Sequence, residues 1–246
     1  LGWYKALEDW QIDVDVVDGS IFKDQTADQY EVLVLAANDC YALDPDSELE
    51  QGIAAWVKNG GMLLHGPMDL LAQASVGSRC LSHGKDAFEC SGEKGMLTGT
   101  QFGSFEEENA DVLAVWETDE KPASVKRTFG KGTVCEIGFF YGFEYTGRIA
   151  PHVPLTQRNN ELYPLTMLKK DPVGMLLEEK FGTTLTRKKG VERAEFENGT
   201  VIVNHSSYPC RIDEPGTRYF QNPELYQDLD SKILLPHMGV FIERKV

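Results

Sequence analysis

The chain has little positive charge. Across 246 residues, 24 lysines and arginines stand against 39 aspartates and glutamates, which gives a formal net charge of −15. Proteins that bind nucleic acid need a basic surface for the phosphates, so this excess of acid argues against a nucleic-acid partner. The chain also lacks any apolar run of about 18 residues, the length that a membrane-spanning helix needs. We therefore expect no membrane partner.

Cysteine is scarce and irregularly spaced. The five cysteines are Cys40, Cys80, Cys90, Cys135 and Cys210. This odd, widely spaced set predicts no disulfide framework and favours a reducing cytoplasm. The run Cys80-x-x-His83, followed by Cys90, supplies only part of the two ligand pairs that a structural zinc site normally has. We therefore predict no metal site, and no motif indicates a cofactor.

The first ten residues, LGWYKALEDW, repeat large apolar side chains every three to four positions. This spacing of Trp3, Leu7 and Trp10 predicts an amphipathic helix over 1–10. The segment has neither the basic start nor the apolar centre of a signal peptide. We expect the natural N-terminus to lie upstream, and we predict a cytoplasmic location.

Residues 30–66 have the order of an α/β unit. An apolar strand is predicted over 31–37, and Pro45, Asp46 and Ser47 offer a helix start. The helix has its buried face at Leu49, Ile53, Trp56 and Val57 and stops at Asn59-Gly60-Gly61. A second strand follows over 62–65. Such alternation predicts a mostly parallel sheet covered by helices, as in class I amidotransferases and flavodoxin-like folds. The alternating segment 12–17 predicts one more strand.

The pattern changes in the second half of the chain. Strands are predicted over 110–116, 124–129 and 133–140, followed by a helix over 172–181 with proline in its first turn. Short strands then follow at 184–188, 191–197, 200–204, 211–213 and 239–244. Asn198-Gly199 predicts a hairpin turn between two of them. We therefore predict an α/β domain over 1–182 and a small antiparallel β domain over 183–246.

The predicted frame lacks the residues of an amidotransferase. Such an enzyme needs a nucleophilic cysteine on a sharp strand-to-helix turn, and this chain has His65-Gly66-Pro67-Met68 there. Cys40, after the first strand of the unit, is the one alternative nucleophile, and a packed or loop cysteine is the competing interpretation. Glycosidases need two carboxylates across a sugar, and none of the acidic residues lies on a pattern of barrel strands.

Candidate interface or ligand residues lie in three segments. They are Asn38, Asp39, Cys40 and Tyr41 after the first strand; His65 and Met68 after the second; and Phe140, Tyr141, Phe143, Tyr145, Arg148 and His152 in and after an aromatic run. The aromatic side chains could stack on a sugar, bind another subunit, or form a core strand with a covered loop. These alternatives stay open from the sequence alone.

The order of these segments resembles a known family. The pieces "IDVDVVDG", "YEVLVLAA", "WVKNGGMLLHG" and "FGKGTVCEIGFF" are similar to the trimerisation domain of glycoside hydrolase family 42 β-galactosidases. The tail "VERAEFENGTVIVNHSSYPCRI", closing in "LLPHMGVFIERKV", resembles the small C-terminal β domain of that family. The chain departs from the family at Asn38-Asp39-Cys40 and at His65-Gly66-Pro67.

The resemblance implies an amidotransferase-like fold without amidotransferase activity. The family's two catalytic glutamates lie on an N-terminal barrel of which this chain contains nothing, so no catalytic residue is carried over. The implied partners are copies of the same chain, forming a trimer, and the catalytic barrel of the same protein, with carbohydrate as a further possibility. The alternative is a ThuA-like or amidotransferase-like domain that binds a sugar at the strand ends.

Overall fold

The fold is described from a computed structural model. The structure describes residues 2–36, 47–67, 76–97, 102–146, 165, 168–185, 187, 190–227 and 229–244. Within these ranges, no helix is both long and apolar enough to cross a membrane.

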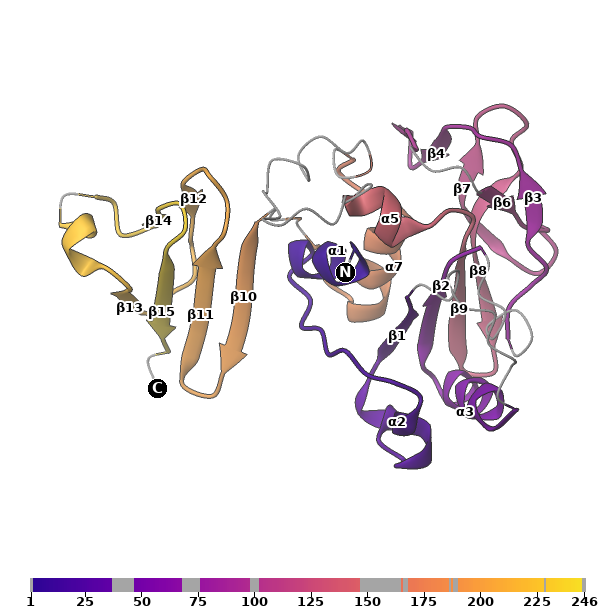
Figure 1. The fold of residues 1–246 in the computed structure, drawn as a ribbon, viewed down its shortest axis with the longest axis horizontal. Coiled ribbons are helices and arrows are strands. Elements are labelled where there is room, and N and C mark those ends of the chain that lie inside the picture. The colour runs from indigo at the N-terminus through magenta and orange to yellow at the C-terminus, as the bar shows by residue number, and fades with distance from the viewer. Residues whose placement is uncertain are drawn as a thin grey trace, which may run out of the picture.

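The larger part of the chain forms a mixed sheet of seven strands (Figure 1). In spatial order the strands are β1 (Val32–Leu35), β2 (Met62–His65), β9 (Gly132–Ile137), β8 (Pro122–Phe129), β7 (Asp111–Trp116), β4 (Phe88–Cys90) and β5 (Glu93–Gly95). The pairs β1–β2 and β2–β9 are parallel, whereas every later pair is antiparallel. The prediction of an α/β fold is confirmed, but the prediction of a mostly parallel sheet is wrong. Parallel pairing needs a crossover such as α3, and tight turns such as Gly130-Lys131 force antiparallel pairing.

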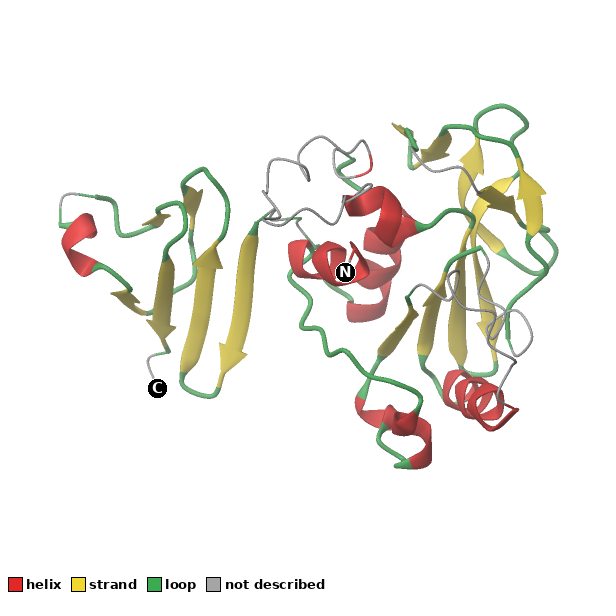
Figure 2. Ribbon diagram, in the orientation of Figure 1, coloured by secondary structure: helices red, strands yellow, loops and turns green. Residues whose placement is uncertain are grey.

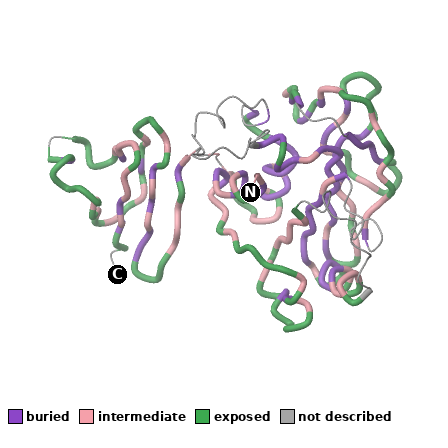
Figure 3. The backbone as a smooth tube through the Cα atoms, in the orientation of Figure 1, coloured by how far each residue is buried: buried purple, intermediate pink, exposed green. Residues whose placement is uncertain are grey.

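Helices cover both faces of this sheet (Figure 2). They are α1 (Gly2–Asp9), α5 (Tyr141–Thr146) and α7 (Pro172–Phe181) on one face, and α2 (Ser20–Lys23), the 3₁₀ turn η1 (Ala27–Gln29) and α3 (Ser47–Lys58) on the other. Strand side chains alternate between the two layers: Met62 and Leu64 pack with the first group of helices, and Leu63 packs with α3. The strands of this sheet contain much of the buried chain (Figure 3).

Helix α7 forms where the sequence predicts it because its two ends carry strong signals. Asp171 precedes the helix, and its side chain accepts a hydrogen bond from Gly174 N at 2.9 Å. Pro172 occupies the first turn, where a missing N–H costs nothing. Gly182 ends the helix in the left-handed conformation, at φ 62°.

The predicted strand over 12–17 is irregular in the structure. Ile12 and Val14 do pack against the larger core, as their alternation implies, but Val16 is 86% exposed. A strand requires a hydrogen-bonded partner as well as a side-chain pattern. Among the described residues, β1 is the edge strand on this side and pairs only with β2.

The C-terminal part forms a separate antiparallel β unit. Its four-stranded sheet has the order β10 (Val191–Phe196), β11 (Gly199–Asn204), β15 (Gly239–Glu243) and β13 (Thr217–Phe220). Beside it lie β12 (Cys210–Arg211), β14 (Ile233–Leu234) and the 3₁₀ turn η4 (Pro223–Tyr226). A further small pair, β3 (Leu81–His83) and β6 (Phe102–Ser104), belongs to the larger part. The predicted antiparallel tail is confirmed, although 184–185 and 187 form no strand. Helix α7 ends at Phe181 and β10 begins at Val191, and the boundary at 182 stays a prediction.

Candidate functional site

A buried polar pair lies at the carboxyl ends of two neighbouring parallel strands. His65 ends β2 and stands opposite Glu136 in the register with β9. Both side chains are fully buried, and His65 Nε2 lies 3.8 Å from Glu136 Oε1. Ligands of open α/β sheets bind at this edge, so these two residues are the first place to look for chemistry.

The carboxylate of Glu136 is fully occupied by donors. Ser78 donates its backbone N–H to Oε1 at 2.6 Å and its hydroxyl to Oε2 at 2.8 Å. Arg127 donates Nε–H to Oε2 at 2.9 Å. The guanidinium and the serine together occupy both carboxylate oxygens with hydrogen bonds from within the chain. His65 Nδ1 lies 2.9 Å from the Gly66 carbonyl oxygen, so the arrangement anchors the strand ends.

The thiols in this part of the chain are not activated. Burial, with a smaller effect of the Glu136 charge, raises the pKa of Cys80 to about 11. Burial likewise raises the pKa of Cys90 to about 12. A cysteine nucleophile needs a lowered pKa to be a thiolate at neutral pH. Neither side chain therefore meets the requirement of an amidotransferase.

Both ring nitrogens of His83 lie within hydrogen-bond distance of an oxygen atom of the chain. Its Nδ1 lies 2.7 Å from the Gly84 carbonyl oxygen, and its Nε2 lies 3.1 Å from Asp119 Oδ1. The imidazole also stacks on Trp116 with ring centroids 4.7 Å apart. Within the described ranges, no three His, Cys, Asp or Glu side chains come together as metal ligands.

The aromatic run divides between core and surface. Tyr141 and Tyr145 are one turn apart on α5 and fully buried. Their hydroxyls donate to Asp171 at 2.8 Å and to Asp9 at 2.5 Å. Both rings therefore pack in the hydrophobic core of this chain. Phe143 lies on the other side of α5 and is 38% exposed, and Phe140 is half-buried, so an interface role stays a prediction for these two.

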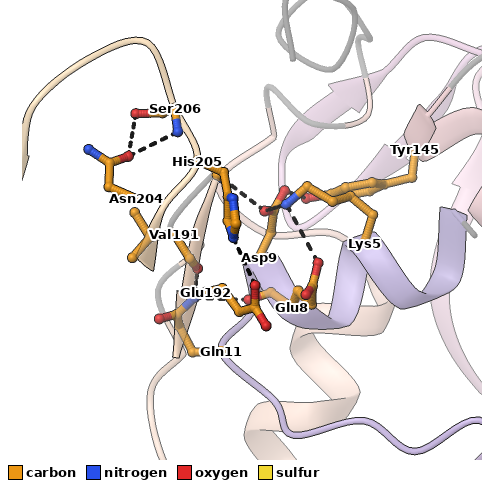
Figure 4. Close-up of polar contacts among 11 residues, drawn as sticks. Lys5, Glu8, Asp9, Gln11, Tyr145, Val191, Glu192, Asn204, His205 and Ser206 are labelled. Carbon is orange, nitrogen blue, oxygen red and sulfur yellow. Dashed lines mark hydrogen bonds and ion pairs between the residues drawn. The ribbon is translucent and has the colours of Figure 1, made fainter. Parts of the chain in front are cut away.

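Asp9 joins α1 to the C-terminal β unit (Figure 4). Besides the Tyr145 hydroxyl, Asp9 accepts the backbone N–H of Gly190 at 3.2 Å and forms an ion pair with Lys5. Two residues further on, the Gln11 side-chain amide donates to the carbonyl of Val191 at 2.7 Å. These bonds connect the start of the chain to the first strand of the C-terminal sheet, so the two parts are joined by directional contacts as well as by the linker.

Arg187 reinforces this seam from the linker. Its guanidinium forms an ion pair with the buried Asp171 and donates to the carbonyls of Leu165 at 3.2 Å and Leu168 at 3.1 Å. It also lies over the ring of Trp10, with Cζ 4.3 Å from the ring centroid. We define the seam as Asp9, Gln11, Tyr145, Asp171, Arg187, Gly190 and Val191.

Several predicted site residues cannot be placed. Asn38, Asp39, Cys40, Tyr41, Met68, Arg148 and His152 lie outside the described residues. The sequence analysis did not identify Glu136, Asp171 or Arg187 as site residues. Glu136 could have been noticed, since it is a lone carboxylate within an apolar strand. Asp171 could have been noticed too, as a cap residue before Pro172. Arg187 had no signal, because its partners are distant in the sequence.

No protein-family model matches this chain, and no curated protein matches it. Solved structures do. A β-galactosidase from the Antarctic haloarchaeon Halorubrum lacusprofundi aligns with a TM-score of 0.66 at 16% identity, covering 100% of this chain and 35% of its own. A GH42 β-galactosidase from G. stearothermophilus aligns with a TM-score of 0.62 at 15% identity, covering 100% and 36%. A β-galactosidase from Marinomonas ef1 gives 0.61 at 17%, covering 99% and 33%.

These likenesses define the class of fold. The whole of this chain, both sheets included, has the fold of a part of GH42 β-galactosidases, which confirms the resemblance found in the sequence. The chain spans about a third of the length of those proteins. At such identities the likeness establishes the fold and leaves activity to be argued from the residues.

Proposed function

We propose that this chain is the non-catalytic C-terminal portion of a β-galactosidase-like glycoside hydrolase. Its amidotransferase-like part would join subunits, as a trimerisation domain, and would help to shape the active site of the parent enzyme. The observation that carries this proposal is the coverage: β-galactosidase structures align over all of this chain with only about a third of their own length.

The described residues support a scaffold role. Glu136, the buried carboxylate at the strand ends, has all its donors within the chain, and Cys80 is a protonated thiol. The seam fixes the β unit to the α/β part with one buried ion pair and several hydrogen bonds, as a rigid accessory region requires. Cys80, Cys90 and Cys135 are thiols and not disulfides, which fits a reducing compartment such as the cytoplasm.

Subunit contacts can be tested with paired surface variants. The exposed Phe143 on α5 is our first interface residue. Phe143→Asp should therefore lower the mass of the assembly that the chain forms, measured by size-exclusion chromatography with light scattering. Met96→Asp is the matched control, since Met96 is 60% exposed and lies after β5. Equal masses for both variants and the parent chain would remove α5 from the interface.

The catalytic part of the proposal has its own test. The chain alone should release no nitrophenol from nitrophenyl β-galactoside, because the proposed catalytic carboxylates belong to the parent barrel. Hydrolysis by the purified chain, surviving in repeated preparations, would refute the non-catalytic assignment.

The alternative is an amidotransferase-like or ThuA-like domain that binds a sugar. Its support is the position of the His65–Glu136 pair, which stands at the edge where such folds bind ligands, although both side chains are buried and Glu136 is bonded within the chain. This alternative predicts a monomer that binds a sugar, or glutaminase activity that Cys40→Ala abolishes.

A further inference from the structure

The four-stranded sheet of the β unit has one covered and one open face. Its inner face packs against β12, β14 and η4 through a small core. On the other face, the register aligns Ala194, Val201, Phe241 and Tyr219 in one row across all four strands. The next row contains Phe196, Gly199, Glu243 and Thr217. We call these two rows the open face.

Three aromatic rings make the open face a platform. Tyr219 and Phe241 are stacked, with centroids 6.2 Å apart and planes inclined by 27°. A side chain at Gly199 would meet the Phe241 ring at 2.7 Å, so this ring lies down against the sheet. Tyr219 is 54% exposed and Phe196 is 52% exposed. Tyr219 and Phe241 share one row and Phe196 lies in the next, and together they form an exposed apolar patch of a kind that is often functional.

Polar groups at the edge of the platform can accept and donate hydrogen bonds. The Tyr219 hydroxyl donates to Glu243 Oε2 at 3.0 Å. Glu243 and Thr217 are both exposed beside the rings. A carboxylate and hydroxyls next to flat rings can bind vicinal hydroxyl groups of a ligand whose other surface is apolar.

The size of the open face argues against a folded partner. An aromatic side chain has about 150–250 Å² to bury, so two half-exposed rings, part of a third and the aliphatic neighbours offer roughly 300–400 Å². A stable protein interface needs about 800 Å² on each partner. Four strands span about 14 Å, which is enough for two or three sugar rings in a chain.

We propose that the open face binds a neutral β-linked polysaccharide. A pyranose ring has an apolar C–H surface that stacks on Tyr219 and Phe241, and its equatorial hydroxyls reach Glu243. The net charge of −15 disfavours anionic polymers. This site lies on the β unit, away from the strand ends of the α/β part, and it does not depend on the proposed role in subunit contacts.

The test is native electrophoresis of the whole chain through gels that contain β-1,4-galactan or hydroxyethylcellulose. At least one polysaccharide should retard the parent chain. Tyr219→Ala should weaken the affinity by about tenfold or more, equivalent to about 1.4 kcal/mol, whereas Tyr219→Phe, which keeps the ring, should weaken it less. Tyr208→Ala is the control, because Tyr208 is 63% exposed but lies outside the open face. Circular dichroism should show every variant folded.

Three results would overturn the proposal. The first is unchanged mobility of the parent chain in both gels. The second is an equal loss of retardation in Tyr208→Ala and Tyr219→Ala. The third is a light-scattering mass that falls in Tyr219→Ala, which would make the open face a contact between copies of the chain.

Discussion

Replacing Arg187 by methionine should lower the free energy of unfolding more than replacing an exposed arginine does. The substitution keeps most of the side-chain volume and removes the guanidinium. It leaves Asp171, which is fully buried, with the Tyr141 hydroxyl and the Gly174 N–H as its remaining donors. It also removes the contact with Trp10 and the guanidinium bonds to the carbonyls of Leu165 and Leu168, of which Leu165 keeps the Leu168 N–H.

The magnitude follows from burial. The Arg187 side chain is 6% exposed and that of Asp171 is 0% exposed, so the pair is desolvated on both sides. Removing one partner of a buried ion pair costs about 3–5 kcal/mol, because the other charge stays buried without compensation. The lost carbonyl bonds are part of the same network and do not add in full. We expect Arg187→Met to lower the free energy of unfolding by about 4 kcal/mol.

Urea denaturation followed by tryptophan fluorescence measures this effect, since Trp10 lies against the guanidinium. Arg211→Met is the matched control: Arg211 pairs with Asp213 at 3.0 Å, but both side chains are more than half exposed, so its transition midpoint should not move. Asp171→Asn combined with Arg187→Met should lose less than the sum of the two single variants. A loss below about 1 kcal/mol in Arg187→Met would refute the role of the buried pair.

Three further predictions follow from single sites. Gly132→Ala should destabilise by about 1–3 kcal/mol in urea melts, because a Cβ there would lie 2.0 Å from a carbonyl oxygen of α3. Gly84→Ala, at a position with open space and no positive φ, should cost less, and the reverse order would contradict the packing. Partial burial raises the pKa of Glu8, against an opposing effect of Lys5. The protonated acid therefore favours the fold, and this contribution is lost as the pH rises through the raised pKa. Glu8→Gln should therefore raise the melting temperature at neutral pH and change it little in acid, and equal shifts at both would contradict this. Burial raises the pKa values of Cys80 and Cys90 to about 11 and about 12, so both thiols should resist iodoacetamide at neutral pH until the chain is unfolded. Peptide mass spectrometry measures the labelling, and rapid labelling of the native chain would contradict this prediction.

Elements with local signals were predictable from the sequence. Helix α7 has its cap, its proline and its terminating glycine within a dozen residues, and the structure places it at the predicted bounds. The segment 12–17 shows the limit of such reasoning. Its apolar side chains alternate as in a strand and pack as expected, but strand formation depends on a distant partner, which the pattern does not specify. The direction of strand pairing is non-local in the same way.

The candidate site was predictable only in part. His65 stands at the predicted strand end, but burial and the occupied Glu136 make it part of the packing. The rings of Tyr141 and Tyr145 are one turn apart on a helix, so they face the core together; the sequence alone allowed a surface as well. Arg187 and Asp9 act through partners far away in the chain, and no local pattern indicates such contacts.

The most direct test of the proposed role is the mass of the unmodified chain in solution, measured by sedimentation equilibrium over a range of concentrations. We predict self-association towards three times the 27.5 kDa of one chain, because the proposed role is to join subunits. A mass that stays at 27.5 kDa at every concentration would contradict that role and favour a monomeric binding domain.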